Sequence, residues 1–71
     1  MTAVERNLAD GPGFDSMVIG AVTRLGQARP REIVRDLAVY GRCTVQAVTA
    51  ALGRGAERGY VRRHPNGCWS R

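Results

Sequence analysis

The sequence predicts a mainly α domain that ends in a small β-hairpin. Three segments between residues 16 and 58 carry apolar residues at helical spacing, and glycines or a proline stand at their boundaries. After residue 59 the pattern shortens, and Pro65-Asn66-Gly67 separates two short segments of strand type. A chain of 71 residues has room for one such domain with a single modest core.

The first helix is expected over residues 16–26. Asp15 or Ser16 is expected to cap it, because a short oxygen-bearing side chain accepts hydrogen bonds from the free N–H groups of the first turn. With Asp15 as the cap, Phe14 and Ile19 stand at the positions of a hydrophobic staple. The predicted apolar face consists of Val18, Val22 and Leu25, and the predicted stop is Gly26.

The second and third helices are expected over residues 30–39 and 44–58. Pro30 suits the first position of a helix, since its missing N–H needs no partner there, and Thr44 is a good cap. The apolar stripes are Ile33 and Leu37 in the second helix, and Val45, Val48, Leu52 and Ala56 in the third. Glycines at positions 53 and 55 weaken a helix, so either the third helix frays or something approaches it closely. Arg58 and Gly59 are expected to end it.

The tail is predicted to form a hairpin over residues 60–71. Pro65, Asn66 and Gly67 fit a type I turn followed by a left-handed residue, which is a common three-residue hairpin loop. Val61 and Trp69 are the expected core-facing side chains, and residues 28–29 form a possible short strand. Two strands alone are marginal, so the hairpin needs a helix to lie on.

The first thirteen residues are interpreted as a flexible arm. Asp10-Gly-Pro-Gly13 has the composition of a hinge, so the domain boundaries are taken as 1–13 for the arm and 14–71 for the folded domain.

Positive charge rises toward the C-terminus. The chain has eleven arginines, no lysine and six acidic residues, a net charge of +5. Residues 1–15 carry one arginine and three acids, whereas residues 54–71 carry five arginines and one acid. This layout is compatible with a solvated basic surface, but it favours a surface that meets phosphate. Arg31 and Arg35 are interpreted as part of a solvated helix face.

Several functional classes find no support in the residues. No apolar run approaches a membrane span and no signal peptide is apparent, so a cytoplasmic protein without membrane contact is expected. The single histidine has no sequence-evident catalytic partner, and no enzyme activity or cofactor is predicted. Cys43, His64 and Cys68 lack the spacing and the fourth ligand of a zinc site, and we expect both cysteines to be free thiols.

The order of elements and the local motifs resemble those of a winged helix-turn-helix domain. The resemblance covers about residues 16–71 and is nearest to bacterial repressors of the penicillinase-repressor type. It is carried by three motifs: Gly26-x-Ala28-x-Pro-x-Glu32-Ile-Val34, Thr44-Val-x-x-Val48 and Leu52-x-x-x-Ala-Glu-Arg-Gly59-Tyr-Val-Arg-Arg63. It implies that helix 44–58 enters the major groove of double-stranded DNA and that hairpin 60–71 is the wing.

The resemblance also implies a set of DNA-binding residues. Gln46 and Thr49 are the expected base readers, because glutamine pairs with adenine and threonine offers a methyl and a hydroxyl. The others are Ala47 and Ala50, which allow close approach; Arg54, for a base or a phosphate; Arg42 and the Thr44 backbone, for a phosphate at the helix start; and Arg62, Arg63 and His64, on the wing. Because Arg62 and Arg63 alternate across a strand, we expect only one of them to point at DNA.

The leading hypothesis is a small transcriptional regulator, such as a repressor, that binds DNA sequence-specifically. One alternative is an architectural or excision factor of a phage or mobile element. Another is a winged-helix module that docks onto a protein. A homodimer and monomers that bind DNA cooperatively are both left open, with the small size and the lack of a helix after the wing favouring monomers.

Overall fold

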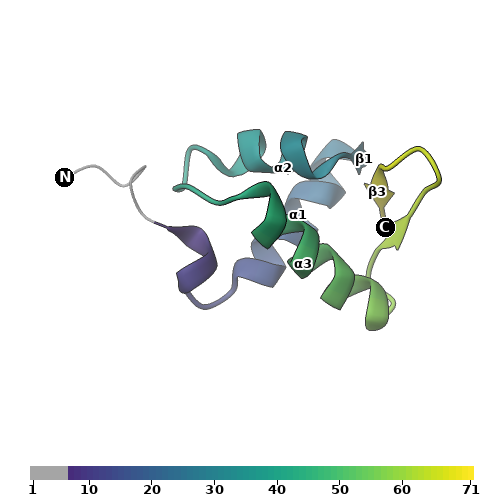
Figure 1. The fold of residues 1–71 in the computed structure, drawn as a ribbon, viewed down its shortest axis with the longest axis horizontal. Helices are drawn as coiled ribbons and strands as arrows, with labels where there is room; N and C mark the ends of the chain where they lie inside the picture. The colour runs from purple at the N-terminus through teal and green to yellow at the C-terminus, as the bar shows by residue number, and fades with distance from the viewer. Residues whose placement is uncertain (1–6) are drawn as a thin grey trace.

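The computed structural model describes residues 7–71, which form a three-helix body with a small sheet at one end (Figure 1). Each helix packs against the other two. The elements, in chain order, are a 3-10 helix η2 (Leu8–Asp10), α1 (Phe14–Leu25), β1 (Gln27–Ala28), α2 (Pro30–Leu37), α3 (Val45–Glu57), β2 (Arg62–Arg63) and β3 (Trp69–Ser70). The predicted fold class, mainly α with a C-terminal hairpin, is confirmed.

The sheet is antiparallel, with β3 between β1 and β2. Trp69 lies opposite Ala28 on one side and Arg63 on the other, while Ser70 lies opposite Gln27 and Arg62. The loop between β2 and β3 is the predicted one: the His64 N–H donates to the Cys68 carbonyl at 2.8 Å, and Gly67 has a φ of 87°. Only glycine adopts that φ at little cost.

The core lies where the three helices and the sheet meet. Its largest fully buried side chains belong to the three helices: Val18, Val22, Ile33, Leu37, Val48 and Leu52. Val61 and Trp69 are also buried, which confirms the predicted inward side of the hairpin. Leu25, predicted to share the buried face of the first helix, is instead 43% exposed. None of the helices in the described residues is long and apolar enough to cross a bilayer.

The helix boundaries differ from the prediction at two places. α1 begins at Phe14 with Gly13 at the cap position and no side-chain cap, so the predicted cap at Asp15 or Ser16 and the staple built on it are wrong. Phe14 is itself a buried core residue. α2 begins at Pro30 as predicted but ends at Leu37, two residues early.

The buried face of α3 is rotated from the predicted stripe. Val48 and Leu52 are buried as expected, but Val45 and Ala56 are exposed, and Ala51 and Gly55 are buried instead. Gly55 has a packing reason, because a Cβ there would stand 2.8 Å from Ile19 Cδ1 and 3.2 Å from Val61 Cγ2. The two glycines do not fray the helix, which continues to Glu57.

The segment before α1 packs on the domain as far back as residue 7. Leu8 is 3% exposed and belongs to the core. Its N–H donates to the Arg42 carbonyl at 2.8 Å, and Asn7 forms a parallel bridge with Arg42. Asn7 and Leu8, which fall in the predicted arm, are therefore packed against the domain. Residues 1–6 of the predicted arm lie outside the described residues.

Candidate nucleic-acid interface

The outer face of α3 is uncharged over its first two turns. Gln46, Thr49 and Ala50 are exposed there, on the side of the helix opposite the buried residues. The Thr49 hydroxyl donates to the Val45 carbonyl at 2.8 Å, so its remaining oxygen lone pairs and its methyl are left for other contacts. Ala47 differs from the prediction, because it is half-buried and packs against the core.

The start of α3 is held by its cap. The Thr44 hydroxyl oxygen accepts a hydrogen bond from the Ala47 N–H at 3.0 Å, so this side chain caps the helix. An anion would therefore bind here to the free backbone N–H groups of the first turn. Arg42 is exposed beside Thr44, and the two residues line one shallow groove together with Asn7 and Cys43. The predicted pairing of an arginine with a helix N-terminus at this place is therefore present in the structure.

A second shallow groove brings α2, α3 and the hairpin loop to one face. It is lined by the first turn of α2 with the residue before it, by Val45 and by Gly67. Arg29 and Arg31 border the groove, and the Val45 side chain is 45% exposed in it. The Glu32 carboxylate accepts the Arg29 N–H at 2.8 Å, so this acid is occupied in capping α2. Arg29 and Arg31 are not among the predicted contacts, and Arg31 is predicted to belong to a solvated helix face.

The hairpin arginines lie on opposite sides of β2. Arg62 shares a row with Ser70, and Arg63 shares a row with Trp69 on the side that continues into the core. Both side chains are exposed, because β2 is an edge strand. His64, a predicted DNA contact on the wing, is half-buried, and its Nε2 lies 2.6 Å from Ser70 Oγ. This hydrogen bond joins the His64 side chain to β3.

Arg54 is exposed on α3 and pairs with a carboxylate of α1. Its Nε and Nη2 donate to the two carboxylate oxygens of Asp15 at 2.8 and 2.7 Å, which joins α3 to α1. These hydrogen bonds, helped by the charges of Arg54 and Arg58, hold the pKa of Asp15 below its ordinary value. In the structure this guanidinium is engaged in an intramolecular ion pair, and its predicted contact with DNA stays a prediction.

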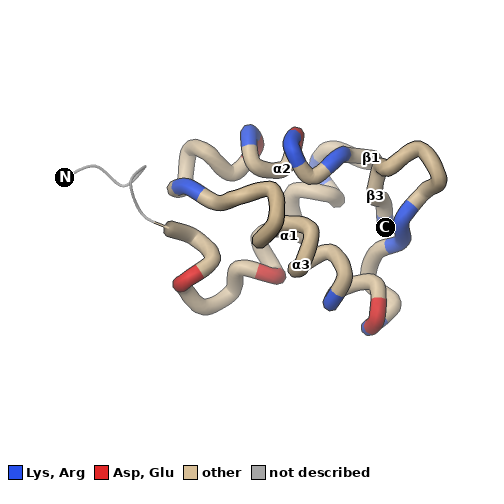
Figure 2. Tube along the Cα trace, viewed as in Figure 1, with Lys and Arg blue, Asp and Glu red and all other residues tan. Residues whose placement is uncertain are grey.

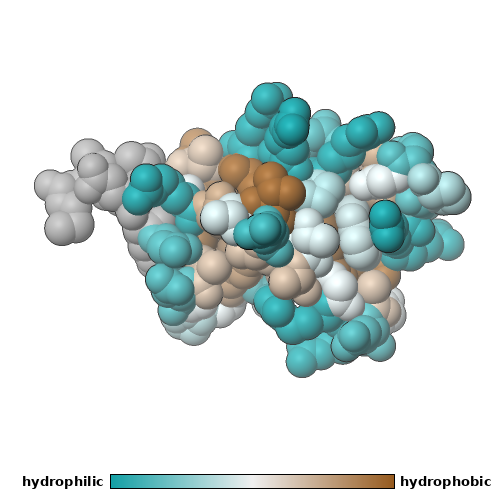
Figure 3. Space-filling view, in the orientation of Figure 1, coloured by the Kyte–Doolittle hydropathy of each residue, from teal (hydrophilic) through white to brown (hydrophobic). Residues whose placement is uncertain are grey.

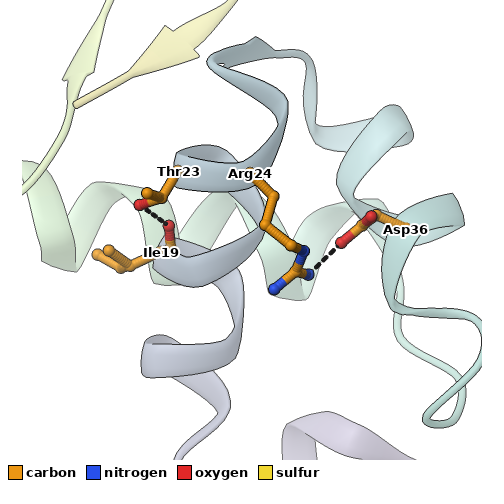
Figure 4. Close-up of polar contacts among 4 residues, drawn as sticks. All are labelled: Ile19, Thr23, Arg24 and Asp36. Carbon is orange, nitrogen blue, oxygen red and sulfur yellow. Dashed lines mark hydrogen bonds and ion pairs between the residues drawn. The ribbon is translucent and has the colours of Figure 1, made fainter.

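A further ion pair joins α1 to α2. Arg24 pairs with Asp36, and the neighbouring Thr23 hydroxyl donates to the Ile19 carbonyl (Figure 4). Within residues 7–71, Arg24 and Arg54 are the arginines found in ion pairs. The arginines outside such pairs are Arg29, Arg31, Arg35, Arg42, Arg58, Arg62, Arg63 and Arg71.

Basic positions lie on part of the surface around the uncharged stretch of α3. Figure 2 shows them along α2, on the segment that leads into α3 and on the hairpin, whereas acidic positions lie toward α1. Figure 3 shows hydrophobic surface over the start of α3 with hydrophilic residues around it. Such an arrangement offers apolar and amide contacts at its centre and guanidinium groups at its rim.

The two cysteines are not joined to each other in the structure. Cys43 and Cys68 are each half-buried, and partial burial raises the pKa of the Cys43 thiol. In the described part of the chain, no three His, Cys, Asp or Glu side chains gather as a metal site requires.

The layout of three helices followed by a small antiparallel sheet is compatible with that of winged-helix domains. Comparison of the chain with protein-family models, curated proteins and solved structures gave no match. What the chain does must therefore be argued from the arrangement of its own residues.

Proposed function

We propose that the chain is a small transcriptional regulator of the winged-helix type, which binds double-stranded DNA sequence-specifically. In this proposal α3 enters the major groove and hairpin 60–71 is the wing. One observation carries it: arginines at the start of α2 and before α3 line grooves that reach the start of α3, whose outer face is uncharged over its first two turns. A recognition helix reads bases with neutral side chains, while cations at its rim hold the phosphates.

The outer face of α3 has the chemistry to read A·T base pairs. The Gln46 amide can accept from and donate to adenine at N6 and N7, which is a two-point contact. The Thr49 methyl, Ala50 and the exposed Val45 side chain are apolar groups of the kind that contact a thymine methyl. We therefore expect A·T pairs at the centre of the bound site.

The phosphate contacts are assigned to the rim. Arg29 and Arg31 line the groove beside Val45, while Arg62 and Arg63 lie on opposite faces of β2, so one of them can face a phosphate from the wing. Arg42 and the start of α3 offer a third anion site. Guanidinium groups suit this role, because their planar fork pairs with two phosphate oxygens at once.

The test is binding to a duplex selected from a random library, measured at several salt concentrations. Affinity should fall steeply with salt, because phosphate contacts release counterions. The variant Arg62→Glu with Arg63→Glu should bind about a hundredfold more weakly at low salt. The matched control, Arg58→Glu with Arg71→Glu, makes the same change in net charge on residues that line a groove against α1, and should lose much less. Equal losses in the two variants would mean that net charge and not this face binds DNA.

A second candidate function is docking onto a protein. It is favoured by Val39 and Tyr40, which follow α2 with 72% and 52% of their surface exposed. If the wild-type chain shows no salt-dependent duplex binding, docking becomes the better proposal. The sequence of the selected duplex also distinguishes the two kinds of DNA-binding protein. An inverted repeat indicates a homodimer, whereas single or tandem sites indicate the cooperative monomers of an architectural or excision factor.

A further inference from the structure

Two glycines in α3 differ in what surrounds them. A Cβ at Gly55 would stand 2.8 Å from Ile19 Cδ1 and 3.2 Å from Val61 Cγ2, so the packing around α3 gives a reason for glycine there. A Cβ at Gly53 would meet nothing within 4 Å. The difference shows that the fold explains one of these glycines and leaves the other without an internal reason.

The backbone at Gly53 does not call for glycine either. The residue lies inside α3, four residues before its end, and its φ is not among the positive values found at other glycines. Alanine fits such a position without strain and stabilises a helix interior relative to glycine. Folding alone therefore favours alanine at position 53.

Gly53 lies on the side of α3 that carries the exposed Gln46. It follows Gln46 by seven residues, which is almost two full turns, so the two positions lie on the same side of the helix. Glu57 follows on the same side one turn later and is exposed. Gly53 thus stands between the predicted base reader and an acid that repels phosphate.

The size of the major groove makes this position sensitive. A helix with its side chains is about 10–12 Å across, and the major groove of B-DNA is about 12 Å wide. A helix that enters the groove therefore has almost no clearance, and each side chain on the side that carries Gln46 sets how deeply it can lie.

Building on the proposed function, we propose that Gly53 is the point of closest approach between α3 and the DNA duplex. The missing side chain makes room for the floor of the major groove one turn beyond Ala50. Gly53 is in this sense a positioning residue, because it sets the depth at which Gln46 and Thr49 meet the bases. The contact ends before Glu57.

The experiment combines Gly53→Ala with a matched control, Gly20→Ala. Gly20 also lies inside a helix, α1, and a Cβ there would meet only Arg24 Nη1 at an ordinary 3.7 Å. Both variants should raise the melting temperature, by about 4–8 °C for a domain of this size. In binding to the selected duplex, Gly53→Ala should be about tenfold weaker and Gly53→Leu weaker still, while Gly20→Ala should match the wild type.

Three results would contradict the role of Gly53. If the wild type binds the duplex and Gly53→Ala binds equally well, the closest approach is elsewhere and only this inference falls. If Gly53→Ala lowers the melting temperature, the fold does require glycine, and the inference loses its basis. If the wild type binds no duplex at low salt, the proposed function falls and takes this inference with it.

Discussion

The two sides of α3 differ in what surrounds their residues. On the side toward α1, Arg54 pairs with Asp15, and the Ile19 and Val61 side chains occupy the space beside Gly55. The residues on this side therefore hold α3 against the rest of the domain. On the outer side the residues before Glu57 are neutral, and Gly53 faces open space. The comparison teaches that an arginine on a helix surface can serve packing between helices, because a carboxylate elsewhere in the fold can pair with it.

The largest expected effect comes from overfilling the side that faces α1. Gly55→Leu should destabilise the domain by about 3 kcal/mol, because the new side chain collides with Ile19 and Val61 in a packed core. Urea denaturation followed by circular dichroism measures this loss. Gly53→Leu is the matched variant on the outer side and should unfold no more easily than the wild type. Equal destabilisation by both variants would remove the distinction between the two sides.

A smaller effect separates the two kinds of arginine. Arg31→Ala should weaken duplex binding about tenfold and reduce the salt slope by about one, because one phosphate contact is lost. Arg54→Ala should leave the salt slope unchanged, since its guanidinium is already engaged with Asp15. Fluorescence anisotropy over a salt series measures both quantities. A reduced slope for Arg54→Ala with an unchanged slope for Arg31→Ala would reverse the assignment.

The smallest effect concerns the ion pair itself. Because the folded state holds the pKa of Asp15 below its ordinary value, the ionised carboxylate stabilises the fold at neutral pH, and this contribution is lost as the pH falls through that lowered pKa. Asp15→Asn should therefore cost less than about 1 kcal/mol at pH 7, the range of exposed ion pairs. The difference between the variant and the wild type should narrow once the pH falls below the ordinary pKa of an aspartate. Thermal melts across that pH range provide the test, and a difference that stays constant would mean that Asp15 does not act through its charge.

Local patterns predicted the elements and the turns well. Pro30 starts α2, Thr44 caps α3 and Gly67 forms the hairpin turn, because each of these signals acts on the few residues around it. The buried face of α3 was harder to predict. Alanine and glycine occupy both sides of the helix and give little contrast in hydropathy. The predicted buried stripe of α3 therefore includes Val45, which is exposed, and omits Gly55, which is buried.

The features of the candidate site that sequence patterns do not predict are contacts between distant residues. Asp15 and Arg54 are 39 positions apart, and no periodicity links them. The groove formed by Arg29, Arg31, Val45 and Gly67 likewise depends on how α2, α3 and the hairpin pack together. The sequence was sufficient to place Gln46, Thr49 and Ala50 on the outer face, because helical spacing alone determines that.

The most direct measurement is a map of backbone amide chemical shifts in the wild-type chain as the selected duplex is added. The proposed interface predicts that the largest changes occur at Gln46, Thr49 and Gly53, with further changes in the first turn of α2 and in the hairpin. Amides on the outer side of α1, such as Ser16, Gly20 and Thr23, should change little. Changes concentrated on α1, or none on α3 at saturating duplex, would contradict the proposal that the outer face of α3 binds DNA.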